Sequence, residues 1–313
     1  MAAGSKRKWG DKPYHSLDYE MKHRFGEKVY KISLAGGTTC PNRDGTLDHR
    51  GCIFCSEHGS GDFASPRQGS ITEQIDREIH RIRQQKKTGH KFIAYFQSFT
   101  GTYAPVSDLK RMYEEAMEHR DVALLSIATR PDCLPDDVLR LLADCRKKIP
   151  VIVELGLQTV HEDTVSYIRR GYPTEIYDHA VARLKSIGIE VVTHVIAGLP
   201  GETKEDFLKT VAHTARQKSD GIKLQLLHVL KGTDLAGEYA QHTFDVLSFD
   251  AYLDYITTAL TILPPDIVIH RLTGDGPRDL LTAPLWSLDK RRVLNALHQK
   301  MKRENIWQGM SCH

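Results

Sequence analysis

The chain has 313 residues, enough for one large domain or two small ones, which excludes a peptide or a small disulfide scaffold. Its 43 lysine and arginine residues against 40 aspartate and glutamate residues give a formal charge of +3, so charge alone does not establish a nucleic-acid partner. There is no run of about 18 apolar residues and no apolar signal segment near residue 10, so we expect a cytoplasmic protein without a membrane span.

Strand and helix patterns alternate from residue 28 to residue 230. Apolar alternation or short apolar runs predict strands at 28–34, 92–96, 122–128, 151–157, 190–197 and 221–230. Apolar residues at helical spacing predict helices at 71–82, 109–117, 136–145, 176–187 and 204–217. Strands that are apolar almost throughout are typical of parallel sheets covered on both faces. The fold class is therefore α/β, and six strand–helix units favour a partial (β/α)6 barrel of the TIM type over a doubly wound sheet.

The alternation ends after the sixth strand. Helices are predicted at 250–263 and 290–303, with the segment 270–281 between them. We expect an N-terminal extension at 1–27, a barrel at 28–232 and a C-terminal α/β extension at 233–313 that closes the barrel.

Three of the six cysteines crowd into one loop directly after the first strand. Cys40, Cys52 and Cys55 have the spacing C-x11-C-x2-C. The other three are scattered, at Cys133, Cys145 and Cys312. Clustered thiolates bind zinc or an iron–sulfur cluster, and a four-iron cluster with three protein ligands leaves one iron open for a small molecule.

A structural zinc ion is the alternative, because His49 or His58 could supply a fourth ligand. The spacing alone leaves zinc and a cluster equally open. The position of the loop favours catalysis, since barrel enzymes place reactive groups at the carboxyl ends of their strands.

Several segments together resemble the radical S-adenosylmethionine (SAM) superfamily, in particular its YhcC/YtqA branch, which is related to the radical domain of the elongator catalytic subunit. The resemblance spans nearly the whole chain and rests on KISLAGGTTCPNRDG, GCIFC, YFQSFTGTYAP, ATRPDCLPD, VELGLQTVHEDT, HVIAGLPGET, DGIKLQLLHVLKGT and HRLTGDGPRDLLTAPLW. The gap of eleven residues after the first cysteine departs from the usual three in the superfamily and matches this branch.

The resemblance implies one 4Fe-4S cluster and SAM as cofactors. Cys40, Cys52 and Cys55 would be the metal ligands and the catalytic residues, because an electron passed through the cluster cleaves SAM to a 5'-deoxyadenosyl radical. An external electron donor such as flavodoxin or ferredoxin would supply that electron. We expect no second cluster from the remaining cysteines.

The resemblance also implies SAM contacts at the strand ends. The expected set is Phe54, Gln97, Ser98, Arg130, Glu154, Gln158, Ile196 and Gly198. Gln97 and Ser98 stand where the superfamily often has a Gly-Gly-Glu turn, so the carboxylate that receives the methionyl ammonium is missing from this position.

Five of these contacts have a structural alternative. Phe54 could be ordinary loop packing, and Gly198 could belong to an ordinary strand-to-helix turn. Arg130 could form a structural salt bridge. Glu154 or Gln158 could instead stitch the barrel interior together.

The resemblance to this branch and to the elongator catalytic subunit implies tRNA as the partner, and the carbon-five side chain of its wobble uridine as the target. Candidate substrate-binding residues are Lys223, His228, Lys231, Arg271, Arg291, Arg292, Lys302 and Arg303. The last four would form the basic face of the 290–303 helix, whose apolar stripe packs inward. Basic residues in such clusters, including 81–87, 146–148 and 169–170, usually form solvated surface instead.

Two other functions stay open at this point. One is radical chemistry on a small metabolite or a tetrapyrrole. The other is a noncatalytic RNA-binding protein with structural zinc at Cys40, Cys52, Cys55 and His58.

Overall fold

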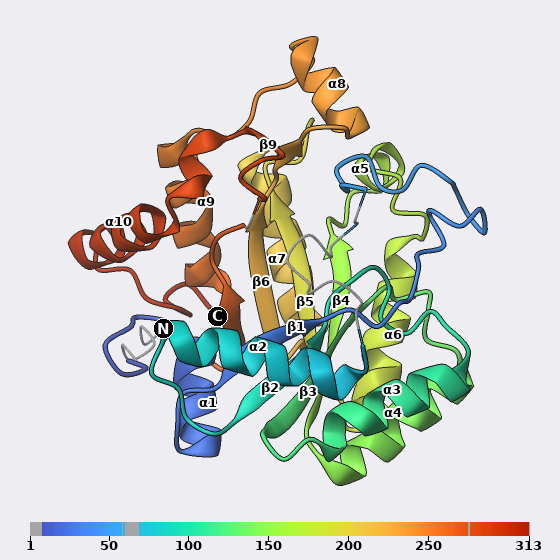
Figure 1. Cartoon of the computed structure of the whole chain (residues 1–313). Helices are drawn as coiled ribbons and strands as arrows, with labels where there is room; N and C mark the ends of the chain where they lie inside the picture. Colours follow the sequence, from blue (N-terminus) through green and yellow to red (C-terminus); the bar gives the residue numbers. More distant parts are fainter. Residues whose placement is uncertain (1–7, 58, 60–68, 275, 313) are drawn as a thin grey trace.

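The computed structural model describes residues 8–57, 59, 69–274 and 276–312, and its centre is one curled sheet of seven parallel strands (Figure 1). The strands lie in the order β1 (Tyr30–Leu34), β2 (Phe92–Phe96), β3 (Val122–Thr129), β4 (Val151–Gln158), β5 (Glu190–Ala197), β6 (Gly221–Leu226) and β8 (Val268–Arg271). The first six strands neighbour one another in chain order, as right-handed strand–helix units require. The expected α/β class and partial barrel are thereby confirmed.

Helices cover the outer face of the sheet. They are α2 (Ile71–Gln85), α3 (Val106–Glu118), α4 (Asp136–Lys148), α6 (Thr174–Ser186) and α7 (Lys204–Arg216), with the short α5 (Glu162–Tyr167) after β4. The isoleucines of α2 are buried as their spacing predicts, and Ser70 and Glu73 form a capping box at its start. Outward-facing strand residues such as Ile32, Phe92 and Val153 complete this main core.

The seventh strand comes from the C-terminal extension, which the sequence predicted only as a closing segment. β8 pairs in parallel with β6, with Gly221 opposite Val268. The predicted strand 221–230 is in fact divided, because the chain turns after β6 and β7 (Val229–Leu230) pairs antiparallel with β9 (Leu281–Ala283). The extension therefore widens the sheet as well as covering it.

The two ends of the barrel are covered differently. α1 (Leu17–Phe25) lies at the amino end, where Met21 packs against Ile93, Leu124 and Val192 (Figure 1). α8 (Asp234–Ala240), β9 and the 3₁₀ helix η1 (Leu285–Leu288) lie at the carboxyl end. The boundaries at residues 27 and 232 stay a prediction.

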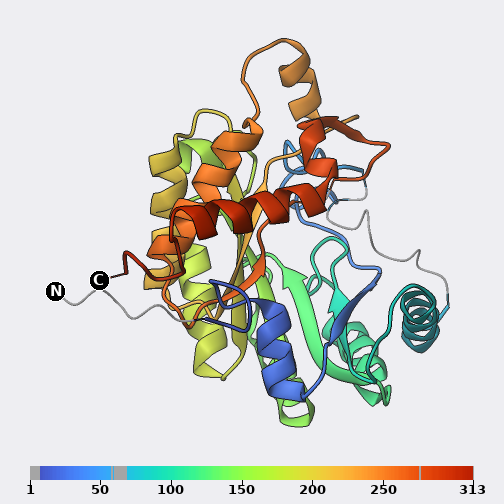
Figure 2. The same cartoon turned by 90° about the vertical axis from the view of Figure 1, so that its left-hand side faces the viewer.

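α9 (Phe249–Ile262) and α10 (Lys290–Arg303) pack together on one flank of the sheet (Figure 2). The predicted apolar stripe of α10 is confirmed, because Val293, Leu297 and Met301 are buried. Among the described residues, none of these helices combines the length and apolar character that crossing a bilayer requires.

Candidate active site

A cavity of about 280 Å³ opens at the carboxyl ends of β1 to β6. Its lining joins the cysteine loop, residues 40–55, to polar side chains on the inner face of the sheet. Because six strand ends converge there, residues far apart in the sequence meet around one space. This is the end of a barrel at which chemistry is normally found.

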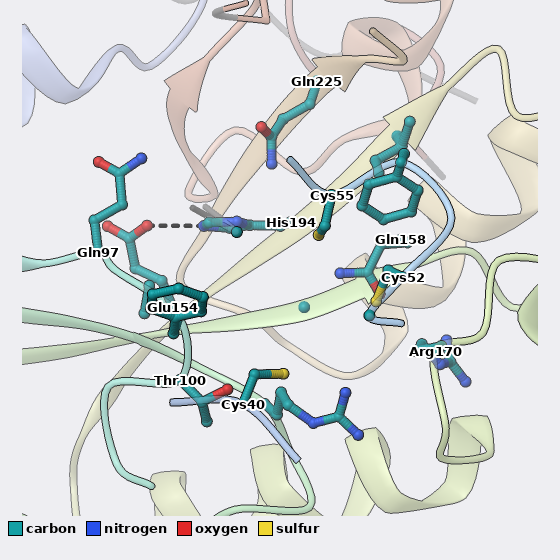
Figure 3. Close-up of a pocket in the computed structure, with 18 of the residues that line it drawn as sticks. Cys40, Cys52, Cys55, Gln97, Thr100, Glu154, Gln158, Arg170, His194 and Gln225 are labelled. Carbon is teal, nitrogen blue, oxygen red and sulfur yellow. Dashed lines mark hydrogen bonds and ion pairs between the residues drawn. The ribbon is translucent and has the colours of Figure 1, made fainter. Parts of the chain in front are cut away.

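Cys40, Cys52 and Cys55 all line this cavity and surround a common space (Figure 3). The loop is wound by its own backbone: the carbonyl of Cys40 accepts from the amide of Arg43 at 2.8 Å, and the carbonyl of Cys52 accepts from the amide of Cys55 at 3.0 Å. The structure therefore brings the three cysteines of the loop to one cavity.

Polar residues hold the loop from both sides. Asn42 is buried, and its Nδ2 donates to the carbonyl of Arg169 at 2.6 Å and to Cys52 Sγ at 3.5 Å. Arg43 Nη2 donates to the carbonyl of Cys55 at 3.1 Å. Arg169 Nε donates to the carbonyl of Gly51 at 3.0 Å, and its Nη2 pairs with Asp234 of α8 at 2.6 Å. These hydrogen bonds provide donors for the carbonyl groups of Gly51, Cys55 and Arg169, as buried backbone groups require.

The thiols of Cys52 and Cys55 interact with each other. The hydrogen bond between them lowers the pKa of Cys52 to about 6 against the effect of burial, with help from the charge of Arg130. The same hydrogen bond and burial raise the pKa of Cys55 well above its ordinary value. The lowered pKa favours the thiolate of Cys52, which is the form that binds metals.

In the described part of the chain, which leaves out His58, no group of three His, Cys, Asp or Glu side chains is gathered tightly enough to hold one metal ion. A zinc ion needs every sulfur about 2.3 Å away, whereas an iron–sulfur cluster is larger and takes each cysteine on a different iron. His49, the other suggested zinc ligand, is exposed. Three thiols around one cavity are a donor set that suits a 4Fe-4S cluster with one open iron.

Gln158 ends β4 in an unusual conformation. Its φ of 59° is left-handed, and the pairing of β4 with β5 shifts register at this point. Its Oε1 is buried and has no hydrogen-bond partner among the described residues. Gly156 makes the room, because a Cβ there would lie 2.4 Å from Gln158 Nε2. A strained residue with an unpaired acceptor in a cavity indicates a ligand that donates to it.

The other predicted SAM contacts divide into two groups. Phe54, Gln97 and Ile196 line the cavity, and Gln97 Oε1 accepts from Ser33 Oγ at 3.3 Å. Ser98 and Gly198 are not among the described residues that line it. The need for glycine at Gly198 has a structural cause, because its φ is 84° and a Cβ would lie 2.8 Å from Leu247 Cγ.

Arg130 also lines the cavity but forms the salt bridge that was its alternative. Its Nε and Nη2 donate to the two carboxylate oxygens of Asp132 at 2.9 and 2.7 Å, and its guanidinium lies over the ring of Tyr172. Cys133 is buried beside this pair, and burial raises the pKa of its thiol. Such a thiol is poorly reactive.

Glu154 is the centre of a polar network inside the barrel. Its carboxylate accepts hydrogen bonds from five side chains, namely Lys31 Nζ at 2.5 Å, Ser126 Oγ at 2.8 Å, His194 Nε2 at 2.8 Å, Tyr95 OH at 3.0 Å and Lys223 Nζ. Burial would raise the pKa of Glu154, but Lys223, Lys31 and His194 outweigh it and hold that pKa well below its usual range. Because five protein side chains already donate to this carboxylate, the structure favours the alternative that Glu154 stabilises the barrel interior over a direct contact with SAM.

The family is decided by comparison with known proteins. The profile of the radical SAM superfamily matches residues 37–213, and that of the radical SAM C-terminal domain matches residues 219–303. The chain belongs to the radical SAM superfamily. The uncharacterized protein YtqA of Bacillus subtilis is 44% identical over 299 residues, covering 96% of this chain and 92% of that protein, which confirms the expected branch.

Two more distant similarities are to a tRNA uridine(34) acetyltransferase in sequence and to Elp3 in fold. The tRNA uridine(34) acetyltransferase of Dehalococcoides mccartyi is 27% identical over 214 residues, covering 66% of this chain and 46% of that protein. The solved structure of Elp3 from the archaeon Methanocaldococcus infernus superposes with a TM-score of 0.67 at 16% identity, over 90% of this chain and 64% of that one. This similarity shows that the two chains share a fold.

Membership of the radical SAM superfamily implies an enzyme with a 4Fe-4S cluster and SAM. The residues present fit both groups: three convergent thiols for the cluster, and beside them a buried amide oxygen on Gln158 that needs a donor.

The substrate candidates of this radical SAM protein are also divided. Lys223, His228 and Arg271 line the cavity. Lys231 lies on the surface, where its Nζ donates to the carbonyl of Asp279 at 2.9 Å. The basic residues of α10 do not line the described cavity; they are exposed on the flank, and they are Arg291, Arg292, Lys302 and Arg303.

Sequence reasoning missed several cavity residues. Tyr95, His194 and Gln225 lie two positions from Gln97, Ile196 and Lys223 on their strands, so the period of two places them on the same face. The alternation of side chains along each strand could therefore have identified these three residues from the sequence.

Arg170 carried no such signal. The sequence placed it in a basic cluster, 169–170, expected to be either an RNA-binding or a solvated surface, and for Arg170 both expectations are wrong. The side chain is 2% exposed and donates to the carbonyls of Leu157, Thr159 and Tyr172 at 2.6, 2.7 and 2.9 Å. These bonds hold the end of β4 that presents Gln158. Carbonyls left unpaired where β4 leaves the sheet explain why a cation is buried there.

Proposed function

We propose that this radical SAM enzyme modifies the carbon-five side chain of the wobble uridine of tRNA. The observation that carries the proposal is the meeting of three cysteines and the Gln158 amide oxygen, unpaired among the described residues, around one cavity at the carboxyl end of the barrel. The similarity to a tRNA uridine(34) acetyltransferase supports tRNA as the substrate and position 34 as the target.

In this proposal, Cys40, Cys52 and Cys55 hold the cluster, and Phe54 and Ile196 form an apolar wall for adenine. Gln158 Oε1 accepts from a hydroxyl or ammonium group of SAM, for which it has no competing protein donor among the described residues. The chemistry that the bound cofactors supply is removal of a hydrogen atom from an unreactive carbon.

The loop and the mouth of the cavity protect this chemistry from water. Ile53 of the cysteine loop packs with Ile168, Leu227 and Leu235 in a separate apolar cluster. The amide of Leu235 on α8 donates to the carbonyl of Ile53 at 3.1 Å. The C-terminal extension thus helps to close the end of the barrel at which a reactive radical must be shielded.

The proposal is tested with anaerobically purified protein and tRNA from a strain that lacks it. We expect tRNA to raise the formation of 5'-deoxyadenosine, and mass spectrometry of the tRNA nucleosides to show a changed uridine at the wobble position. Equal consumption of SAM without tRNA, with unchanged nucleosides, would refute a tRNA substrate and favour a small metabolite or tetrapyrrole.

Removing the proposed SAM contacts should weaken SAM binding without loss of the cluster. We expect Phe54→Ala and Gln158→Gly each to raise the Kd for SAM several-fold, on the order of 1 kcal/mol. Glycine is the informative substitution at position 158, because it removes the side chain with its amide and adopts the left-handed backbone without strain. Isothermal titration measures the affinity, and visible absorbance checks the cluster. An unchanged Kd in both variants would contradict this placement of SAM.

The basic face of α10 should contribute to docking of tRNA. Arg292 and Arg303 are about 16 Å apart along the helix axis, far enough to meet separate phosphates. We expect Arg292→Glu with Arg303→Glu to weaken tRNA binding and to reduce the slope of log Kd against log salt by roughly one to two. Filter binding at several salt concentrations measures both.

The matched control for this double reversal is Arg111→Glu with Arg120→Glu. These arginines are 78% and 91% exposed in and just after α3, away from α10. The control should keep the wild-type salt slope, and both pairs should keep SAM cleavage in the absence of tRNA. If the α10 pair also binds like wild type, α10 is not the docking surface.

A further inference from the structure

Four phenyl or phenol rings line the described part of the cavity, and the protein engages three of them. They belong to Phe54, Tyr95, Phe99 and Tyr172. Two lysine ammonium groups lie 4.5 and 4.7 Å from the ring centre of Tyr95, and two guanidinium groups lie 4.9 and 4.7 Å from that of Tyr172. Phe54 packs against the apolar cluster that includes Leu235 of α8. Phe99 is the ring that remains.

The ring of Phe99 is half-buried at the wall of the cavity. Among the described residues it makes no aromatic or cation–π contact and belongs to none of the apolar clusters. Its edge lies against Gly59, where an added Cβ would come within 2.9 Å of Phe99 Cδ1. An aromatic side chain that lines a cavity without packing into a core has its π-face available to a ligand.

The backbone of Phe99 is held in a strained conformation. Its φ of 53° is left-handed, which is rare for a bulky residue. The carbonyl of Ser98 accepts from Thr38 Oγ1 at 3.3 Å, and on the other side the amide of Thr100 donates to the carbonyl of Thr39 at 3.1 Å. Such strain persists where the surrounding structure imposes it, and it concentrates at ligand sites. Here it directs Phe99 and Thr100, which would point to opposite faces of an extended strand, to the same cavity.

Thr100 brings a hydroxyl group to this cavity. The residue is 1% exposed, and its Oγ1 has no hydrogen-bond partner among the described residues. Figure 3 shows this hydroxyl pointing toward the space beside Cys40. Because buried polar groups are nearly always hydrogen-bonded, we expect a ligand in the cavity to supply the partner.

The residues assigned to SAM lie elsewhere around the cavity. The apolar wall proposed for adenine combines Phe54 of the cysteine loop with Ile196 of β5, and Gln158 ends β4. Phe99 and Thr100 follow β2, which β3 separates from β4 in the sheet. The ring and the hydroxyl are therefore available to a second ligand beside SAM, and the second ligand of such an enzyme is its substrate.

Resting on the proposed function, we propose that Phe99 and Thr100 bind the base of the substrate nucleotide, the ring by stacking and the hydroxyl by a hydrogen bond to the edge of the base. Bases in an anticodon loop are single-stranded, so they can leave the stack and lie on an aromatic side chain. A uracil has a flat π-face, with carbonyl and N–H groups at its edge, and these match the two groups that this segment presents. A ligand without a flat face would leave the strained ring unused.

The test compares two anticodon stem–loop RNAs that differ only at the wobble position, where one carries uridine and the other an abasic ribose. We expect the full-length protein with its cofactors to bind the uridine RNA about tenfold more tightly, as one base–aromatic stack allows. Phe99→Leu keeps an apolar side chain but has no π-face, and it should reduce this preference to within about twofold. Thr100→Val removes the hydroxyl and should reduce the preference to about threefold. Both variants should keep the Kd for SAM.

Two variants serve as controls. Phe99→Tyr retains the ring and should keep the wild-type preference, which separates stacking from any effect on folding. Phe244→Leu changes a half-buried ring that packs against Tyr239 outside the described cavity lining, and it should keep the preference as well. Equal binding of the two RNAs by the wild type would overturn the inference. So would a Phe99→Leu variant that keeps the preference, and if that variant also lost affinity for SAM, the ring would stack on adenine instead.

If neither RNA binds the wild type, the proposed tRNA function fails and the base site is judged separately. Uridine and ribose are then compared as probes of thermal stability with SAM bound. Uridine should raise the melting temperature of the wild type, of Phe99→Tyr and of Phe244→Leu, but not of Phe99→Leu. Equal effects of uridine and ribose on the wild type would overturn the base site itself.

Discussion

Replacement of Cys40, Cys52 or Cys55 by alanine is expected to abolish the formation of 5'-deoxyadenosine from SAM. Each of the three thiols lines the same cavity, and a four-iron cluster with an open iron needs all three as ligands. The measurement is chromatography of the products after reduction with dithionite, together with iron content and visible absorbance. We expect the activity to fall below detection and the absorbance of the cluster to be lost or strongly reduced.

Cys133→Ala is the matched control for these three substitutions. Cys133 is a buried thiol near the same loop, but its Sγ lies 3.7 Å from Asp132 Oδ1 and it is not among the described cavity residues. This variant should retain iron and SAM cleavage. Full activity in any of the three alanine variants, or zinc in place of iron in the wild type, would contradict the assigned ligands. His58 lies outside the described residues, and we expect His58→Ala to keep its iron.

Glu154→Ala is expected to lower the free energy of unfolding by about 3 to 5 kcal/mol, because it leaves the buried Lys223 and the partly buried Lys31 without their common carboxylate. Glu154 is 1% exposed, so water cannot replace the lost interaction. Urea unfolding at pH 7 measures the change. A loss of this size is a large share of the total stability of an ordinary domain.

Glu190→Ala provides the surface comparison on the neighbouring strand β5. Glu190 is 38% exposed and pairs with Arg24 at 2.7 Å, and an exposed pair is worth less than about 1 kcal/mol. If Glu154→Ala costs no more than Glu190→Ala, the interior network does not stabilise the barrel.

The effect of Glu154→Ala should depend on pH in a defined direction. The pKa of Glu154 is held below its ordinary value of 4.5, so the folded state favours the charged carboxylate. The stabilisation is then fully present above pH 4.5 and is lost as the pH falls below it. The difference in stability between wild type and Glu154→Ala should therefore shrink in acid. A difference that grows below pH 4.5 would contradict the charged state of Glu154.

Local patterns in the sequence determined most of the barrel. The alternation of strand and helix from residue 28 to β6 follows from periods of 2 and 3.6 residues, which neighbouring side chains decide. The stripe of Val293, Leu297 and Met301 on α10 is equally local. The spacing of Cys40, Cys52 and Cys55 identified the loop that faces the cavity, because three thiols within 16 residues have few other uses.

Tertiary structure decided the features that depend on distant partners. β8 joins the sheet only because β6 offers it an edge, and the short segment 268–271 has no strong pattern of its own. Ser98 and Gly198 stand beside residues that line the cavity but do not line it themselves, because a chain that turns at a strand end no longer alternates predictably.

The interior charges are the clearest case. Glu154 receives partners from five other positions on five strands, and the sequence shows these side chains only as separate polar residues. Arginine is a residue type usually found on the surface. Arg170 is nevertheless buried, because its guanidinium donates to backbone carbonyls where β4 ends. Local sequence determines which face of a strand a side chain takes, whereas the cost of burying a charge is settled only by the partners that folding brings to it.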